Sequence, residues 1–240
     1  MTILAVVRDV CAMVGVEIPT SVFSGINTNR TMQEMLAHAN EMAQRTAGDT
    51  KDWTTLKTYT TFIGDGVKTA FDLPVDYRRM PTTANLWVSS YGQSPARFFP
   101  STDEWLKRRN NDATLVGSEW TIIGGKMHIW PAMAIGTTAS FVYLSKNCVA
   151  LTSGGFGETF MADNDRYVLD ERLLKLNMIW QWKASKGSPY AEDMGTYTDA
   201  LAMATGYDSP APIILGSLPV SANARIAYPF PVTGPDWPLT

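Results

Sequence analysis

The sequence has few cysteines and few histidines, and each shortage excludes a class of site. Cys11 and Cys148 are the only cysteines among 240 residues, which is too few for a disulfide framework or a zinc ribbon and is typical of a reducing compartment. His38 and His128 are the only histidines, so a Ser-His-Asp triad would have to use one of them. Neither lies near a Gly-x-Ser-x-Gly turn, and we expect both to be packing residues. The sequence therefore predicts no metal site and no cofactor.

Long apolar runs and strong net charge are also missing. No run of about 18 apolar residues occurs, so no transmembrane helix is expected. No basic stretch precedes the first apolar residues, so we expect no secretory signal. The 20 basic residues nearly balance 23 acidic ones, whereas a general DNA-coating protein needs a net basic surface. With 45% hydrophobic and 18% charged residues, the chain is not expected to be disordered throughout.

Helical periodicity marks both ends of the chain. Apolar residues recur at three- and four-residue steps in four segments, and each segment is followed by a glycine. Asp170 stands where a helix cap is expected, and Pro189 stands where a helix can begin. The predicted helices are residues 3–14, 32–47, 170–186 and 188–205.

Between these helices, residues 54–146 have the composition of β-strands, rich in Thr, Val, Ile and aromatic residues and punctuated by Gly and Pro. Asp65-Gly66 predicts one hairpin and Gly124-Gly125 a second. Residues 101–109 predict one short helix that begins with a capping box. The expected fold is α+β: a four-helix bundle from the N- and C-terminal segments (1–53 and 165–206), a central antiparallel β insertion (54–164) and an extended C-terminal arm (207–240).

The predicted arm is the most unusual segment. Residues 207–240 hold seven of the 14 prolines and only three charges, and proline at this density excludes helices and central strands. Disordered segments are usually charged and poor in hydrophobic residues, whereas this one is apolar. We infer an arm that docks on an external surface; the alternative is an arm wrapped over its own domain. The expected docking residues are Ile213, Ile214, Leu215, Leu218, Val220, Ile226, Tyr228, Phe230 and Trp237.

Three polar features bear on possible chemistry. The glycine-rich loop 153–159 lacks the Gly-Lys-Ser/Thr ending of a phosphate loop, which favours a flexible loop. The basic clusters at 78–79 and 107–109 are short, and we interpret them as exposed charges rather than phosphate contacts. Four acidic residues near the third helix are expected to cap and solvate it rather than to bind a cation. They are Asp163, Asp165, Asp170 and Glu171.

The eight tryptophans suggest two interpretations. Trp87, Trp130 and Trp180 fall in apolar patterns and are expected in the core. The alternative is a carbohydrate-binding or glycan-processing module that uses Trp105 or Trp120. No combination of nucleophile, base and oxyanion donor stands out, so we expect no enzyme.

The order of motifs resembles the head–tail adaptor (connector) proteins of tailed bacteriophages, including the tail tubular and gatekeeper-type adaptors of short-tailed phages. The resemblance covers most of residues 1–205. It lies in the helix 31–42, Trp53, the segment Phe62-Ile63-Gly64-Asp65-Gly66, the Leu73-Pro74-Val75-Asp76-Tyr77 turn, and the late helix 170–183 that contains Trp180 and Trp182.

This resemblance implies a structural protein of the virion neck, assembled in the host cytoplasm. It implies a homo-oligomeric ring, typically of twelve copies, beneath the portal protein, with the arm docked on the portal and the β region facing a tail tube, nozzle or stopper protein. Double-stranded DNA passes through the ring, and no membrane or cofactor is involved. The methionine-rich second helix, with Met32, Met35 and Met42, is expected at the subunit interface. A different phage tail-completion protein is the other alternative.

Overall fold

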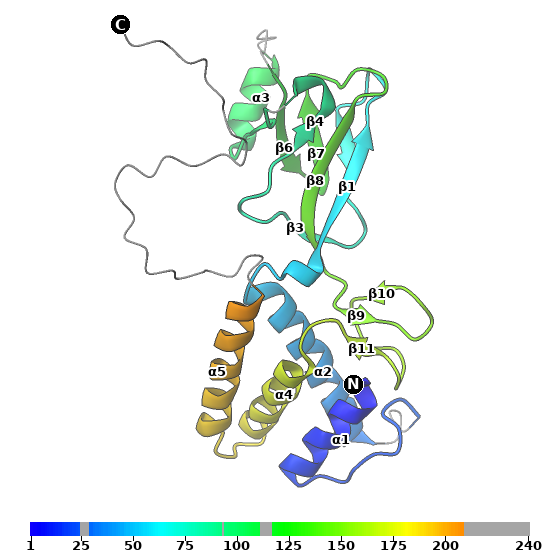
Figure 1. Ribbon diagram of the computed structural model, residues 1–240, viewed down its shortest axis with the longest axis vertical. Coiled ribbons are helices and arrows are strands. Elements are labelled where there is room, and N and C mark those ends of the chain that lie inside the picture. The colour runs from blue at the N-terminus through cyan, green and yellow to red at the C-terminus, as the bar shows by residue number, and fades with distance from the viewer. Residues whose placement is uncertain (25–28, 93, 111–116, 209–240) are drawn as a thin grey trace, which may run out of the picture. The chain divides into compact units, whose positions relative to one another are not determined.

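A computed structural model gives the architecture of the chain (Figure 1). The structure describes residues 1–24, 29–92, 94–110 and 117–208, and the following statements concern these residues. They belong to one unit, Met1–Ser209. The fold is mixed α+β, as predicted. Its helices are α1 (Ile3–Val14), α2 (Arg30–Asp49), α3 (Thr102–Asn110), α4 (Glu171–Ser185) and α5 (Ala191–Tyr207).

Local sequence signals set the helix ends. The Thr2 hydroxyl accepts a hydrogen bond from the Ala5 amide, and Gly15, at a φ of 73°, closes α1 in the left-handed conformation that glycine adopts without strain. The Asn29 side chain accepts from the first amides of α2. The Asp170 carboxylate accepts from the Arg172 amide at 2.8 Å, so the predicted cap of α4 is confirmed.

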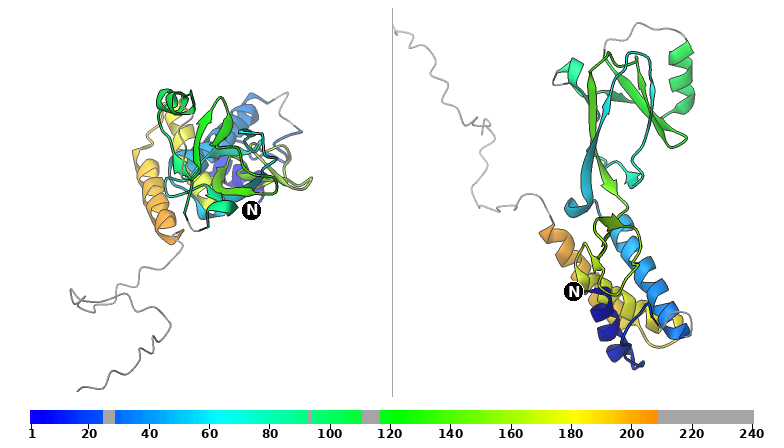
Figure 2. Two further views of the ribbon diagram at one scale, coloured as in Figure 1. Left: turned by 90° about the horizontal axis from the view of Figure 1, so that it is seen from above. Right: turned by 90° about the vertical axis from the view of Figure 1, so that its right-hand side faces the viewer.

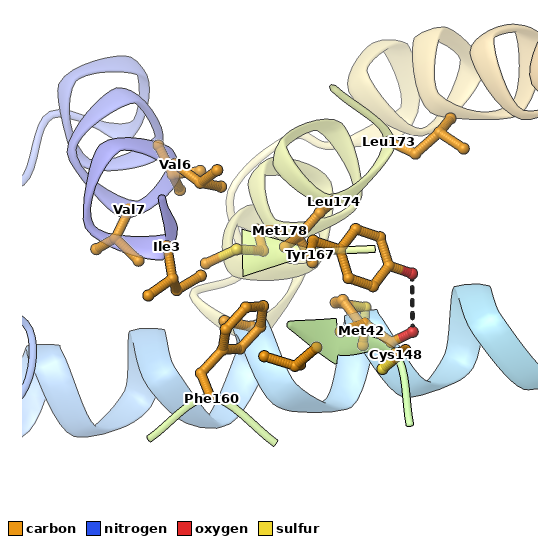
Figure 3. Close-up of a cluster of buried hydrophobic side chains, with 14 of the residues drawn as sticks. Ile3, Val6, Val7, Met42, Cys148, Phe160, Tyr167, Leu173, Leu174 and Met178 are labelled. Carbon is orange, nitrogen blue, oxygen red and sulfur yellow. Dashed lines mark hydrogen bonds between the residues drawn. The ribbon is translucent and has the colours of Figure 1, made fainter. Parts of the chain in front are cut away.

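One hydrophobic core joins the N-terminal and C-terminal helices. Helix α4 contacts α1, α2 and α5, and it buries Leu173, Leu174 and Met178 against side chains of α1 and α2 (Figure 3). The buried Tyr167 hydroxyl donates to the Ala43 carbonyl at 3.0 Å, which satisfies its polar end within the core. Both views of Figure 2 show α4 and α5 running side by side.

Short strands make up the rest of the described fold. One sheet contains β1 (Lys57–Ile63), β8 (Thr138–Ser145) and β3 (Tyr77–Arg79) in that order, with β4 (Trp87–Val88) also paired to β8. A second has the order β2 (Ala70–Asp72), β7 (Lys126–Trp130), β6 (Glu119–Ile123) and β5 (Arg97–Phe98). A third contains β10 (Phe156–Gly157), β9 (Val149–Ala150) and β11 (Arg166–Tyr167).

The two larger sheets share a second hydrophobic core, which contains Phe71, Met127, Ile129 and Phe141. The Gly124-Gly125 hairpin is confirmed, because β6 and β7 pair up to Ile123 opposite Lys126. The prediction of a wholly antiparallel β region is wrong at one place, since β5 pairs with β6 in parallel.

The hairpin predicted at Asp65-Gly66 is wrong. Strand β1 pairs with β8, while β2 pairs with β7 of the other sheet. The Asp65 carboxylate accepts hydrogen bonds from the Val67 and Lys68 amides, which turns the chain. Phe62 and Phe71, on either side of this turn, stack at 4.9 Å between ring centroids. Packing between the sheets therefore prevails over the local turn signal.

None of the helices in the described part of the chain combines the length and the apolar content that a bilayer span requires.

Candidate functional site

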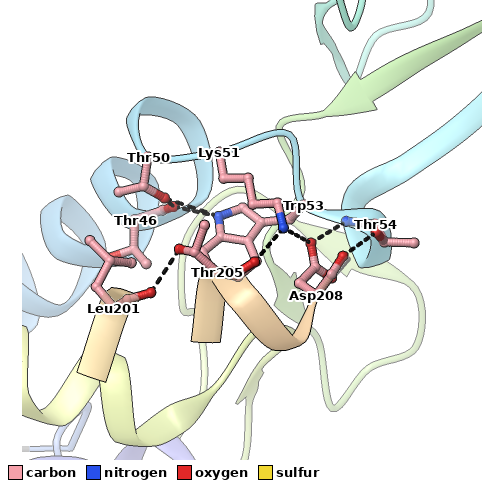
Figure 4. Close-up of polar contacts among 8 residues, drawn as sticks. All are labelled: Thr46, Thr50, Lys51, Trp53, Thr54, Leu201, Thr205 and Asp208. Carbon is pink, nitrogen blue, oxygen red and sulfur yellow. Dashed lines mark hydrogen bonds and ion pairs between the residues drawn. The ribbon is translucent and has the colours of Figure 1, made fainter. Parts of the chain in front are cut away.

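The last residues of α5 are fixed to the connection between α2 and β1 (Figure 4). The Lys51 ammonium donates to the Thr205 carbonyl at 2.6 Å and lies 3.5 Å from the Asp208 carboxylate. The Thr54 amide donates to Asp208 Oδ2 at 3.0 Å, and the Thr54 hydroxyl donates to the Asp208 carbonyl at 3.1 Å. We call Lys51, Thr54, Thr205 and Asp208 the α5 anchor.

The anchor has a simple electrostatic basis. The last carbonyls of α5 lack partners within the helix and carry the negative end of its dipole, so a lysine placed there stabilises the helix. Lys51 and Asp208 are both largely shielded, with side chains 22% and 16% exposed. Beneath them the buried Trp53 donates its indole N–H to the Thr46 carbonyl at 2.8 Å. The anchor therefore fixes the position from which residues 209–240 continue.

Helix α5 itself is weakly buried. Ala200 is its only buried residue, whereas Met194, Met203 and Tyr207 are 44%, 60% and 86% exposed. Polar contacts hold much of the helix: the Asn177 amide donates to the Tyr197 hydroxyl at 3.3 Å, and Lys183 pairs with Asp193 at 2.6 Å. Helix α5 consequently leaves these three large apolar side chains at the surface.

Of the residues predicted to bind partners, the structure describes only the three methionines of α2. All nine predicted docking residues, from Ile213 to Trp237, lie outside the described residues. Met32, Met35 and Met42 are 3%, 0% and 1% exposed and belong to the core of their own chain. A subunit interface through these methionines does not fit their position, because the apolar stripe of α2 packs against α4.

The two histidines and the two cysteines are packing residues. The rings of His38 and Trp182 form an edge-to-face contact with their centroids 5.9 Å apart, and desolvation lowers the pKa of His38. Desolvation, and to a lesser extent the charge of Arg109, lowers the pKa of His128. Burial raises the pKa of the Cys148 thiol to about 11 and that of Cys11 above its ordinary value. The two histidines are partly buried and the two cysteines fully buried, and neutral histidines and protonated thiols are the forms expected in such surroundings.

The acidic residues near α4 organise loops. Asp165 is 1% exposed, and its carboxylate accepts from the Thr152, Met161 and Ala162 amides at 2.7–2.8 Å. Its desolvation would raise the pKa, but these amides outweigh it and the pKa is lowered. Asp163 accepts from the Val22 amide at 2.8 Å. Within the described residues no three His, Cys, Asp or Glu side chains are grouped so as to hold a metal ion.

The basic clusters at 78–79 and 107–109 also have structural partners. Arg79 pairs with Asp52 at 2.7 Å, and Arg78 donates to the Gln44 side chain and main chain of α2. Arg108 pairs with the buried Glu119 at 2.8 Å. These contacts leave the clusters less available to a phosphate backbone than free surface charges would be.

The tryptophans named for a carbohydrate site are buried. Trp105 and Trp120 are 3% and 5% exposed, which leaves neither ring face free to stack on a sugar. Trp87, expected in the core, is instead 46% exposed. A cleft of about 500 Å³ lies beside Trp120, and the half-exposed Phe98 lines it, with the two ring centroids 4.7 Å apart. None of the described residues that line this cleft carries a carboxylate.

The Leu-Pro-Val-Asp-Tyr turn has a clear structural role. The Tyr143 hydroxyl donates to Asp76 Oδ1 at 2.9 Å, and the Ser145 hydroxyl donates to Asp76 Oδ2 at 2.7 Å. The Asp76 carbonyl accepts from the Lys146 amide at 2.8 Å. Asp76 therefore attaches the turn before β3 to the end of β8, next to the helical core.

Sequence reasoning missed the α5 anchor and the exposure of α5. Thr54 and Asp208 are 154 positions apart, and no pattern in the sequence connects them. The single signal for the exposure of α5 is its composition, since small and polar residues separate its large apolar ones.

Comparison of the sequence with protein-family models and with curated proteins identifies no relative. No family model matches the sequence, and no curated protein matches it closely enough to be reported as similar.

Proposed function

We propose that the chain is a non-enzymatic adaptor of a bacteriophage neck, a ring that joins the portal to the tail and lets the genome pass. The observation that carries the proposal is the α5 anchor together with the segment that follows it. Residues 209–240 contain seven prolines and many large apolar side chains, and they start from Asp208, which Lys51 and Thr54 fix in place. A segment that begins at a rigid point and carries apolar docking residues suits attachment to a neighbouring protein.

The arrangement of helices gives further support. We interpret α1, α2, α4 and α5 as a four-helix bundle into which the β region is inserted, which is the organisation expected from the helical periodicity at both ends of the chain. Contact between ring subunits would use Met203 and Tyr207 of α5, in place of the buried methionines of α2. These two exposed apolar side chains are four residues apart and so lie on one face of the helix, an arrangement that suits a protein–protein contact.

Truncation tests the proposal. We expect a chain that ends at Asp208 to fold with an unchanged melting temperature, because the anchor and both hydrophobic cores remain. We expect it to lose attachment to purified portal rings, measured by co-sedimentation and by electron microscopy of the complex. Truncated protein that attaches like the full chain would refute the docking role of residues 209–240.

Point variants make the test sharper. Replacing Tyr228 and Phe230 by serine removes two predicted docking side chains, and we expect attachment to weaken at least tenfold, since aromatic anchors dominate such interfaces. Replacing Ser221 and Asn223 by alanine is the matched control within the same segment and is expected to have little effect. Equal loss in both double variants would argue against specific docking by the aromatic residues.

A further inference from the structure

Strand β1 is an open edge of its sheet. It pairs with β8 on one side only, and the sheet order places no strand of the described chain on its other side (Figure 1). The Gly64 amide donates to the Thr137 carbonyl opposite it at 2.8 Å, which sets the alternation along the strand. In an antiparallel pair alternate residues direct both main-chain groups to the partner, so Thr58, Thr60 and Phe62 face β8.

The intervening residues therefore point their main-chain groups outward. No described residue pairs with the N–H or C=O groups of Tyr59, Thr61 and Ile63. Their side chains share the face of the sheet that is away from the core, with Tyr59 75% and Ile63 68% exposed. Val142, opposite Tyr59, and Trp87, opposite Ser140, extend this face and are 40% and 46% exposed.

From Thr58 to Ile63 this edge has none of the features that keep edge strands single. Proteins usually protect such edges with lysines, prolines or bulges, because unpaired main-chain groups recruit another strand. The stretch from Thr58 to Ile63 has no charge, no proline and no glycine, and its residues favour strands. The nearest charges, Lys57 and Asp65, lie just outside the stretch and have opposite signs. Both are exposed, and the Asp65 carboxylate accepts hydrogen bonds from the Val67 and Lys68 amides.

We propose that β1 pairs antiparallel with β1 of a second copy, about a two-fold axis at Thr61. In this register Tyr59 of each copy lies opposite Ile63 of the other, and Thr61 lies opposite Thr61. Each of the three outward-facing residues then exchanges both main-chain hydrogen bonds with its counterpart. The same register brings Lys57 of each copy towards the turn that contains Asp65 of the other, so opposite charges meet at the ends of the strands. The apolar faces of the two copies become continuous.

This inference does not depend on the proposed function. A contact across a two-fold axis uses the same surface on both copies and closes on itself, so it gives a dimer of the free chain and cannot by itself produce a ring. Its failure is therefore distinguishable from failure of portal attachment, which depends on residues 209–240.

Charge substitution at the axis tests the register. We expect the wild-type chain to show a concentration-dependent dimer in sedimentation velocity. Thr61→Lys and Thr61→Asp each place like charges opposite each other, and each should raise the dimer dissociation constant by roughly fivefold or more at low salt. An equimolar mixture of the two variants should recover the dimer as a heterodimer, since Lys then faces Asp.

The matched control uses an exposed threonine on α5. Thr196→Lys, Thr196→Asp and their mixture are expected to leave dimerisation at the wild-type level. Melting temperatures of the two Thr61 variants should stay within a few degrees of the wild type, because that side chain is exposed and loses a single hydrogen bond, the one with the Ser140 hydroxyl at 2.8 Å. A wild-type chain that stays monomeric at every attainable concentration overturns the proposal and leaves the edge to a strand of a different protein. A dimer that neither Thr61 variant weakens overturns it as well.

Discussion

Asp76 shows at the scale of one residue how a turn is attached to a strand. Its carboxylate accepts hydrogen bonds from the hydroxyls of Tyr143 and Ser145, so two polar groups of β8 depend on one acceptor. Desolvation, with the hydrogen bond to Asp76 and the charge of Asp76, raises the pKa of Tyr143 to about 12. Both stability and titration therefore report on the same contact.

Removing this acceptor should change both readouts. We expect Asp76→Ala to lower the free energy of unfolding by about 1–3 kcal/mol, because two partly buried hydroxyls lose their acceptor. We expect Asp76→Asn, which keeps an acceptor but removes the charge, to cost less and to lower the pKa of Tyr143. Urea unfolding measures the first effect, and spectroscopic titration of tyrosine measures the second. An unchanged tyrosine titration in Asp76→Asn would show that desolvation alone sets this pKa.

His38 gives the fold a dependence on pH. Desolvation lowers its pKa in the folded chain, against a weaker opposing effect of Glu34, so the unfolded chain binds the proton more tightly. The stabilising contribution is thus complete above the unfolded pKa of about 6.5 and is lost as the pH falls through the folded pKa.

We expect the free energy of unfolding to decrease between about pH 7 and pH 5, and His38→Gln to reduce that decrease. Urea unfolding at several pH values provides the measurement. His128→Gln is the comparison, since the pKa of His128 is lowered as well. If both variants retain the full wild-type slope, the histidines do not cause the pH dependence.

At the scale of elements, α4 and α5 differ sharply in how they are held. Helix α4 buries six residues between its neighbours, whereas α5 buries only Ala200 and relies on Tyr197, Lys183 and the α5 anchor. Elements with little buried apolar surface open locally at lower free energy than the core. Of these two helices, α5 is therefore the one whose position depends more on polar contacts.

Loosening the anchor should affect α5 selectively. We expect Asp208→Ala to speed hydrogen exchange of amides in the last turns of α5 by about tenfold, the effect of losing roughly 1–1.5 kcal/mol of local stability. Amides of α4 should exchange at the wild-type rate. Glu192→Ala, at the other end of α5, is the control. Faster exchange throughout α4 and α5 would show that the anchor supports both helices instead.

At the scale of the whole molecule, helix ends and short hairpins could be predicted from local sequence signals. Contacts between segments that are distant in the sequence could not. The ends of α1 and α4 follow from Gly15 and Asp170, and the β6–β7 hairpin follows from Gly124-Gly125. The Asp65-Gly66 hairpin failed because Phe62 and Phe71 pack between two sheets. Hydrophobic periodicity located helix α2, yet a stripe of methionines has the same spacing whether it meets its own chain or a neighbour.

The candidate site was less accessible to sequence reasoning than the fold. The proposed docking role of the C-terminal segment depends on its composition alone, because prolines and apolar residues with little charge are unusual together. The α5 anchor could not be inferred from the sequence, since it depends on residues that only the folded chain brings together. Burial of Trp105 and Trp120 and exposure of Trp87 are likewise decided by the packing of sheets rather than by local pattern.

The two native thiols lie in the same core, and this gives the molecule a built-in chemical reporter. Cys11 and Cys148 are both fully buried among the side chains of the helices, and the core between the larger sheets contains no cysteine. Because only an exposed thiolate reacts with an alkylating reagent, the labelling rate of the unmodified chain measures how often the helical core opens. The labelling rate of a third cysteine, introduced between the two larger sheets, would measure how often the β region opens, separately and in the same sample.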